Sequence, residues 1–136
     1  MTLEVEQVLG ALAFSKPQRV HSIKFITGTQ RANGVVGRGR YDTLLTIYNP
    51  HHRKITFKVR VVQSKRAIGQ NQARSGVIQL TLRGKQAVEL NRTDILRILG
   101  TNRNCAQLMR GVISVEAARS QPLLQVNAAF TKNPIV

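Results

Sequence analysis

Residues 54–61 constrain the fold more than any other segment, because apolar and polar residues alternate along them without a break. A β-strand sends successive side chains to opposite sides, so the alternation predicts a strand with two different faces. The apolar face consists of Ile55, Phe57, Val59 and Val61. The polar face consists of Lys54, Thr56, Lys58 and Arg60. We therefore expect one side of this strand to enter a core and the other to present positive charge.

The charge of the whole chain indicates a negatively charged partner. Lys and Arg number 21 against 6 Asp and Glu, which gives a net charge of +15 at pH 7. Apolar residues make up 42% of the 136 residues, which suits one folded domain better than a disordered basic tail. Nucleic acid is the partner that best neutralises such a charge. An anionic membrane surface is the weaker alternative, because no strongly amphipathic basic helix is visible.

Cysteine content and the N-terminus bear on the cellular compartment. The single cysteine, Cys105, excludes an internal disulfide framework. The first residues are acidic and lack the layout of a signal peptide. No apolar run approaches the ~20 residues of a membrane-spanning helix. We expect a soluble protein that is made in the cytoplasm and has no membrane partner.

The order of patterns predicts one α+β domain, with residues 1–84 mainly strands and residues 85–136 mainly helices. Residues 3–12 suit either a strand or a short helix. Alternation and β-branched residues predict strands over residues 19–29, 41–48, 54–63 and 76–83. Pro50 and Asn49 favour a turn between the second and third of these. We therefore expect residues 41–63 to form a β-hairpin.

After Gly84 the apolar period changes to that of a helix. Asn91 can cap a helix whose first turn holds Asp94 and which Gly100 ends. Cys105, Leu108, Met109 and Val112 then recur at helical spacing, which predicts a second helix from about Asn102 or Asn104. Residues 123–130 form either a last helix that opens near Pro122 or another strand.

Signals for catalysis are poor, so we expect no enzyme activity and no cofactor. The acidic residues are few and scattered, and a site with paired carboxylates needs two of them to meet. His51 and His52 can hold a metal only with further ligands, and a solvated turn explains them more simply. Cys105 lies on a predicted apolar stripe, where a core position is a better explanation than a nucleophile. We predict no metal site.

The glycine-rich residues 34–40 allow two interpretations. They are not a phosphate-binding P-loop, because no Gly-Lys-Ser/Thr sequence follows. They contain a Gly-x-x-Gly as in the KH RNA-binding loop, but the flanking helices of that module are not predicted. A flexible connection between strands is the simpler interpretation. Arg38 and Arg40 can still contact phosphate from it.

Polar side chains of several predicted strands form the candidate RNA-binding surface, provided that the strand registers place them together. Cations supply salt-sensitive affinity, while Thr, Gln and Tyr can bond to or stack on unpaired bases. The candidate residues are Lys24, Thr46, Tyr48, Lys54, Thr56, Lys58, Arg60, Gln79, Thr81 and Arg83. The alternative is the ordinary solvated face of a half-buried antiparallel sheet. The net charge and the scarcity of acidic residues favour binding.

Other nucleic-acid modules fit less well. Aromatic residues make up only 4% of the chain and Trp is absent, which disfavours the stacking platforms of OB and RRM folds. A helix-turn-helix over residues 92–112 would make the protein a DNA-binding regulator. It would leave the strand-rich part of the chain without a role.

In length and layout the chain resembles the coat proteins of single-stranded RNA bacteriophages, the levivirus type. The similar segments are residues 1–5, 43–47, 53–61, 120–124 and 133–134. The resemblance implies a homodimer whose sheets join edge to edge and whose C-terminal helices pack on the partner's sheet. It implies an icosahedral virion whose inward sheet face binds genomic RNA, made in the host cytoplasm. A cellular basic RNA-binding protein, of ribosomal or mobile-element type, is the alternative function.

Overall fold

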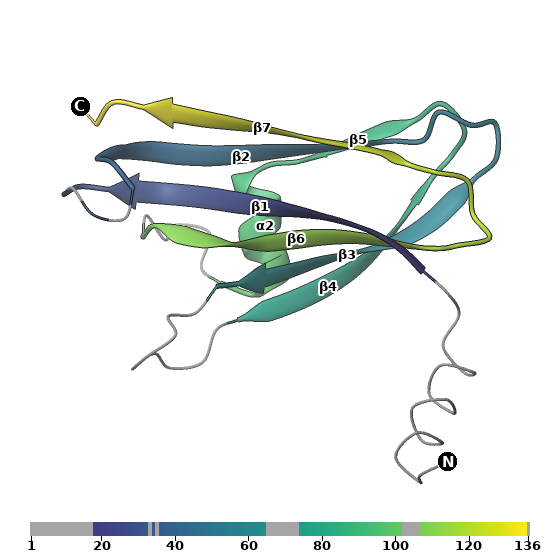
Figure 1. Ribbon diagram of the computed structural model, residues 1–136, viewed down its shortest axis with the longest axis horizontal. Coiled ribbons are helices and arrows are strands. Elements are labelled where there is room, and N and C mark those ends of the chain that lie inside the picture. The colour runs from purple at the N-terminus through teal and green to yellow at the C-terminus, as the bar shows by residue number, and fades with distance from the viewer. Residues whose placement is uncertain (1–17, 33, 35, 65–73, 102–106, 136) are drawn as a thin grey trace, which may run out of the picture.

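The computed structural model describes residues 18–32, 34, 36–64, 74–101 and 107–135, and Figure 1 shows their arrangement. In these residues the chain forms one antiparallel sheet of 7 strands and a single short helix. The elements are β1 (Gln18–Gln30), β2 (Gly39–Tyr48), β3 (Ile55–Gln63), β4 (Ser75–Leu82), β5 (Ala87–Leu90), α2 (Arg92–Leu99), β6 (Met109–Ala118) and β7 (Gln125–Asn133).

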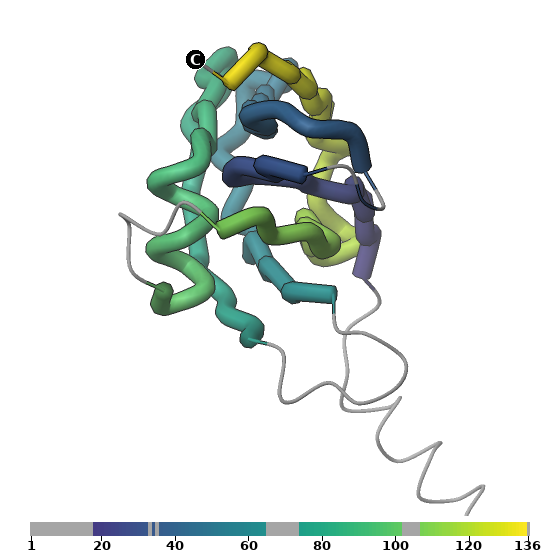
Figure 2. The backbone as a smooth tube through the Cα atoms, turned by 90° about the vertical axis from the view of Figure 1, so that its left-hand side faces the viewer, coloured from purple at the N-terminus to yellow at the C-terminus, as the bar shows by residue number. Residues whose placement is uncertain are grey.

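The strand order across the sheet is β4-β3-β6-β1-β2-β5. β7 pairs with the edge of β2 that lies opposite the edge paired with β1 and β5. The sheet curls into a half-barrel, which the end-on view in Figure 2 makes visible. Only the last three residues of β1 pair with β2. Farther along, the Thr43 hydroxyl donates to the Ile26 carbonyl at 2.8 Å and accepts from the Ile26 N–H at 3.0 Å. A side chain thus replaces the backbone ladder where the two strands diverge.

The core lies inside this curl, and α2 contributes to it. Phe25 of β1, Phe57 of β3 and Ile113 of β6 are buried, together with Leu45 and Ile47 of β2. Ile95, Leu96 and Leu99 of α2 join the same apolar cluster. Burying each such side chain contributes about 1.5–3 kcal/mol. The alternation predicted for β3 is confirmed: its apolar side chains before Val62 are buried, whereas Lys58 and Arg60 are exposed.

Asn49 holds two turns together at one end of the molecule. Its side chain is 0% exposed, and its Nδ2 donates to the carbonyls of Arg53, Leu82 and Arg83 at 2.6, 3.2 and 3.1 Å. Its Oδ1 accepts from the His51 N–H at 3.0 Å. The connection between β2 and β3 is therefore fixed against the turn between β4 and β5.

The α+β class predicted from the sequence is wrong. Residues 85–136, predicted to be mainly helical, form three strands and only one helix where they are described. The described part of this region therefore lacks the C-terminal helices that were expected to pack on a dimer partner. The predicted second helix covers residues 102–112. Its last four residues belong instead to strand β6, which begins at Met109. Residues 102–106, with Cys105, lie outside the described part of the chain. β6 pairs with both β1 and β3, so its side chains alternate between the two faces of the sheet. This pairing on both edges outweighs the short run of apolar residues at helical spacing.

Among the other predictions from the sequence, some are confirmed and one is wrong. The predicted strands over residues 19–29, 41–48, 54–63 and 76–83 are confirmed as β1 to β4. The hairpin of residues 41–63 is wrong, because β2 pairs with β1, β5 and β7 whereas β3 pairs with β4 and β6. The turn that follows β2 is bonded by Asn49 to the β4–β5 turn and does not fold β3 back onto β2. Of the alternatives for residues 123–130, the strand is correct, while residues 3–12 lie outside the described part.

The helix after Asn91 is confirmed in detail. The Asn91 side chain accepts from the Asp94 N–H at 3.1 Å, and the Asp94 carboxylate accepts from the Asn91 N–H at 2.9 Å. These two bonds satisfy backbone donors that the first turn leaves without partners. Gly100 ends the helix in the left-handed conformation, with φ of 73°.

Candidate nucleic-acid interface

The strand registers bring most of the candidate residues onto one surface. Residues directly opposite each other in antiparallel strands share a face of the sheet. Lys58 of β3 lies opposite Gln79 of β4 and Glu116 of β6. Through the same pairings, Lys24 of β1 lies opposite Val112 of β6, which in turn lies opposite Val62 of β3. We call the solvent-facing side of β4, β3, β6 and β1 the outer face; of the candidates it carries Lys24, Thr56, Lys58, Arg60, Gln79 and Thr81.

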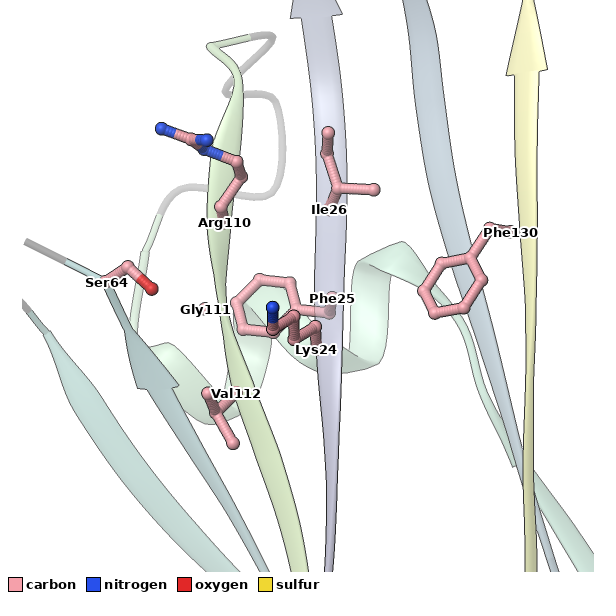
Figure 3. A pocket seen from close by; sticks show the side chains of 8 residues that line it. All are labelled: Lys24, Phe25, Ile26, Ser64, Arg110, Gly111, Val112 and Phe130. Atoms are coloured by element: carbon pink, nitrogen blue, oxygen red, sulfur yellow. The ribbon is translucent and has the colours of Figure 1, made fainter. Parts of the chain in front are cut away.

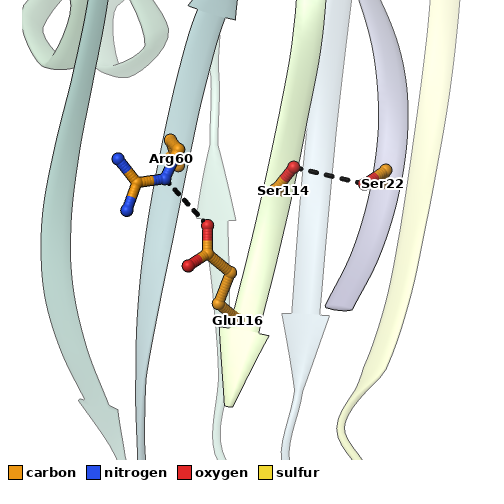
Figure 4. A network of polar contacts seen from close by, with 4 residues as sticks. All are labelled: Ser22, Arg60, Ser114 and Glu116. Carbon is orange, nitrogen blue, oxygen red and sulfur yellow. Dashed lines mark hydrogen bonds and ion pairs between the residues drawn. The ribbon is translucent and has the colours of Figure 1, made fainter. Parts of the chain in front are cut away.

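Hydroxyl pairs connect neighbouring strands on the outer face. The Thr56 and Thr81 hydroxyl oxygens lie 2.9 Å apart, which is a hydrogen bond between β3 and β4. The hydroxyls of Ser22 and Ser114 make a similar bond at 3.2 Å between β1 and β6 (Figure 4). Each hydroxyl can both donate and accept, so these groups retain capacity for a bound polar molecule.

Lys54 and Arg83 lie at one end of the outer face. Lys54 directly precedes β3 and Arg83 directly follows β4, and both are exposed. Arg53 and Lys85 extend this cationic end, on the two turns that Asn49 joins. The Lys85 ammonium donates to the Pro50 carbonyl at 2.6 Å. The end therefore presents positive charge from rigid turns.

Thr46 and Tyr48 do not join the outer face. They lie on β2, where Thr46 is opposite Glu89 and Asn127, and Tyr48 is opposite Ala87 and Gln125. Their neighbours are thus β5 and β7, not the strands that carry Lys58 and Gln79. They were included among the candidates because residues 41–63 were expected to form a hairpin, which does not form.

Sequence reasoning missed an ion pair on the outer face. Arg60 Nε lies 2.9 Å from Glu116 Oε2, which joins β3 to β6 (Figure 4). The Glu116 side chain is only 13% exposed and that of Arg60 is 45% exposed. Arg60 is therefore partly neutralised before any partner binds. No local pattern indicates this pair, because its members are 56 residues apart.

The sequence also missed two further features of the outer face. Arg110 of β6 lies opposite Ile26 of β1 and is exposed, so it adds a cation beyond the predicted set. Val20, Val62 and Val77 are exposed on the same face, which makes it mixed rather than purely polar. Alternation within β6 would have revealed Arg110 if the segment had been interpreted as a strand.

The glycine loop contributes exposed cations at another edge. Arg38 and Arg40 are exposed, and Arg40 lies opposite Asn133 of β7. The Tyr41 hydroxyl donates to the Gly37 carbonyl at 2.5 Å, and the Lys132 ammonium lies 5.8 Å from the centre of the Tyr41 ring. The loop is thus tied to β2 and lies beside the end of β7.

Among the described residues, no group of three or more His, Cys, Asp and Glu side chains is placed to hold a metal ion. His51 Nε2 is instead 2.9 Å from the Leu123 carbonyl. The described part of the chain also contains no helix with the length and apolar character needed to cross a membrane.

Comparison of the chain with protein-family models, curated proteins and solved structures finds no match.

Proposed function

We propose that this protein binds single-stranded RNA along the outer face and its cationic end. The observation that carries the proposal is the arrangement of Lys24, Lys58 and Arg110, which are exposed on one face of a continuous sheet. The carboxylate on the described strands of that face, Glu116, is already bonded to Arg60. When these cations neutralise RNA phosphates, counterions condensed on the RNA are released, which favours association.

The choice of RNA rests on the groups between the cations. The hydroxyls of Thr56, Thr81, Ser22 and Ser114 can bond to base edges and to the 2′-hydroxyl of ribose. The described part of the chain presents no second helix for a helix-turn-helix, because β6 begins at Met109. The role is binding rather than catalysis.

Charge substitutions at the outer face test the proposal. Lys58→Gln, Lys54→Gln and Arg83→Gln together remove positive charge from exposed side chains. We expect the affinity for a short single-stranded RNA to fall, and the slope of log affinity against log salt to decrease by about one per lost phosphate contact. Fluorescence anisotropy at several salt concentrations measures both.

A matched control separates a specific surface from net charge. Arg97 is exposed in the last turn of α2, away from the outer face, so Arg97→Gln loses the same kind of charge elsewhere. The control should change the affinity and the salt slope much less per residue. Equal losses per residue for the control and the outer-face variants would reject a localised binding surface.

A coat subunit that packages RNA is the second candidate, and the edge of β7 favours it. β7 pairs with β2 along one edge, and no described strand pairs with the other edge. An open strand edge is a template for pairing with another chain. Two copies would pair through β7, and RNA-neutralised dimers would associate into a closed shell. Such a shell would be a virion, with its subunits made in the host cytoplasm.

Added charge on β7 tests this second candidate. Asn127 and Ala129 are exposed on that strand, and Asn127→Lys with Ala129→Lys should prevent edge-to-edge pairing. Light scattering should then report monomers, and electron microscopy should show no particles. A wild-type protein that is monomeric with RNA at all concentrations would rule out the coat function and leave RNA binding intact.

A further inference from the structure

A cavity of about 440 Å³ opens on the outer face between β6, β1 and β7 (Figure 3). Its floor consists of paired residues of β1 and β6: Lys24 lies opposite Val112, Phe25 opposite Gly111, and Ile26 opposite Arg110. Phe130 lines the cavity from β7. The volume lies within the range of small-ligand sites in proteins.

Gly111 makes the floor of this cavity possible. A Cβ at this position would lie 2.0 Å from the Val62 carbonyl oxygen and 2.6 Å from Cε1 of Phe25. The buried Phe25 ring therefore occupies the space that a side chain at Gly111 would need. The close packing gives the cavity a fixed floor, since neither strand can shift without disturbing the core.

The rim of the cavity combines one aromatic ring with two cations. The Phe130 side chain is 55% exposed, so much of its ring is accessible to a ligand. Lys24 and Arg110 are exposed, and neither side chain has a hydrogen-bond or ion-pair partner among the described residues. None of the described residues that line the cavity is acidic.

We propose that this cavity binds one unstacked nucleotide of single-stranded RNA, with its base against Phe130 and its flanking phosphates at Lys24 and Arg110. The inference rests on the proposed RNA-binding function and names the element of the ligand that this site recognises. A purely apolar ligand would leave both cations without a partner, and a simple polyanion would make no use of the exposed ring. A nucleotide uses both, because a base supplies a flat π-face and its phosphates supply negative charge.

The test separates base recognition from phosphate binding. Wild-type protein and a Phe130→Ala variant are titrated with a short single-stranded RNA and with an abasic oligomer of the same length and charge. Loss of one stacked base should weaken RNA binding by roughly ten-fold or more. Binding of the abasic oligomer should be unchanged, because Lys24 and Arg110 are intact. Phe130→Leu, which keeps apolar bulk but loses the ring, should behave like the alanine variant.

Leu44→Ala is the matched control, because Leu44 is also apolar and 36% exposed but lies on β2, outside both the cavity and the outer face. It should bind both oligomers like wild type. If Phe130→Ala binds RNA as tightly as wild type, or loses affinity equally for both oligomers, the nucleotide site is overturned while RNA binding along the outer face stands. If wild-type protein binds neither oligomer, both the site and the proposed function are overturned.

Discussion

Arg60 of β3 donates from Nε to the carboxylate of Glu116 on β6 at 2.9 Å, and this bond crosses the surface that we propose for RNA binding. The pair lies between Lys58, which is opposite Glu116, and Ser114, which is opposite Arg60. The carboxylate thus reduces the positive potential at the centre of the outer face. RNA phosphates must compete with it for Arg60.

Glu116→Gln should therefore increase RNA affinity. The substitution keeps the size of the side chain and removes its charge, so Arg60 becomes available to phosphate. We expect tighter binding and a steeper salt dependence, which anisotropy titrations measure. The loss of stability should not exceed about 1 kcal/mol, because partly exposed ion pairs contribute little. Weaker RNA binding by a fully folded variant would show that Glu116 supports the interface instead.

Phe57→Ala should destabilise the protein strongly. Phe57 is buried in β3 and belongs to the central apolar cluster. Truncation of a buried Phe costs about 3–5 kcal/mol, which denaturant unfolding measures. The neighbouring Lys58 points to the opposite, exposed side, and Lys58→Ala should change stability by no more than about 0.5 kcal/mol. Similar losses for both variants would contradict the two-faced description of β3.

Gly111→Ala should also destabilise the fold, although alanine is small. The added methyl group would meet the Val62 carbonyl and the Phe25 ring, so β3 and β6 must move apart and the Phe25 ring must also shift. Overpacking of this kind costs about 1–3 kcal/mol. Ala118→Gly, at the far end of β6, is a comparison that changes one methyl group without a clash. Unchanged unfolding of Gly111→Ala would mean that this floor is not tightly packed.

The individual strands could be predicted because each strand encodes its own two faces. In β3 the alternation between Ile55 and Val61 is complete, and no partner strand is needed to recognise it. The helix after Asn91 could likewise be predicted, since its capping bonds join residues three apart. Local chemistry determines both features.

The pairing of strands could not be predicted, because it depends on residues far apart in the sequence. β2 and β3 are consecutive, yet the bonds of Asn49 to Leu82 and Arg83 direct them to different neighbours. In β6, Met109 and Val112 happen to fit a helical spacing, but pairing on both edges selects the strand. The candidate site depends on the same long-range pairing, so its membership could not be predicted in full. Lys24, Lys58 and Gln79 lie on the outer face, whereas Thr46 and Tyr48 lie on β2 beside other strands.

Asn49→Ala should unfold the end of the molecule at which the cationic turns lie. The Asn49 side chain is fully buried. It donates hydrogen bonds to three carbonyl oxygens and accepts one from the His51 N–H. Each buried polar group left without a partner costs about 1–3 kcal/mol, so the loss should be at least about 2 kcal/mol.

Asn49→Asp distinguishes hydrogen bonding from packing at the same position. It keeps the acceptor for the His51 N–H but places negative oxygen against the three carbonyls, so it should be at least as destabilising as alanine at neutral pH. Exposed His52→Ala is the control, and denaturant unfolding with hydrogen exchange of the Lys85 and Gln86 amides provides the measurements. Both Asn49 variants should also weaken RNA binding, because Arg53, Lys54 and Arg83 would lose their fixed positions. Stable Asn49 variants with protected Lys85 and Gln86 amides would show that the turns do not depend on this side chain.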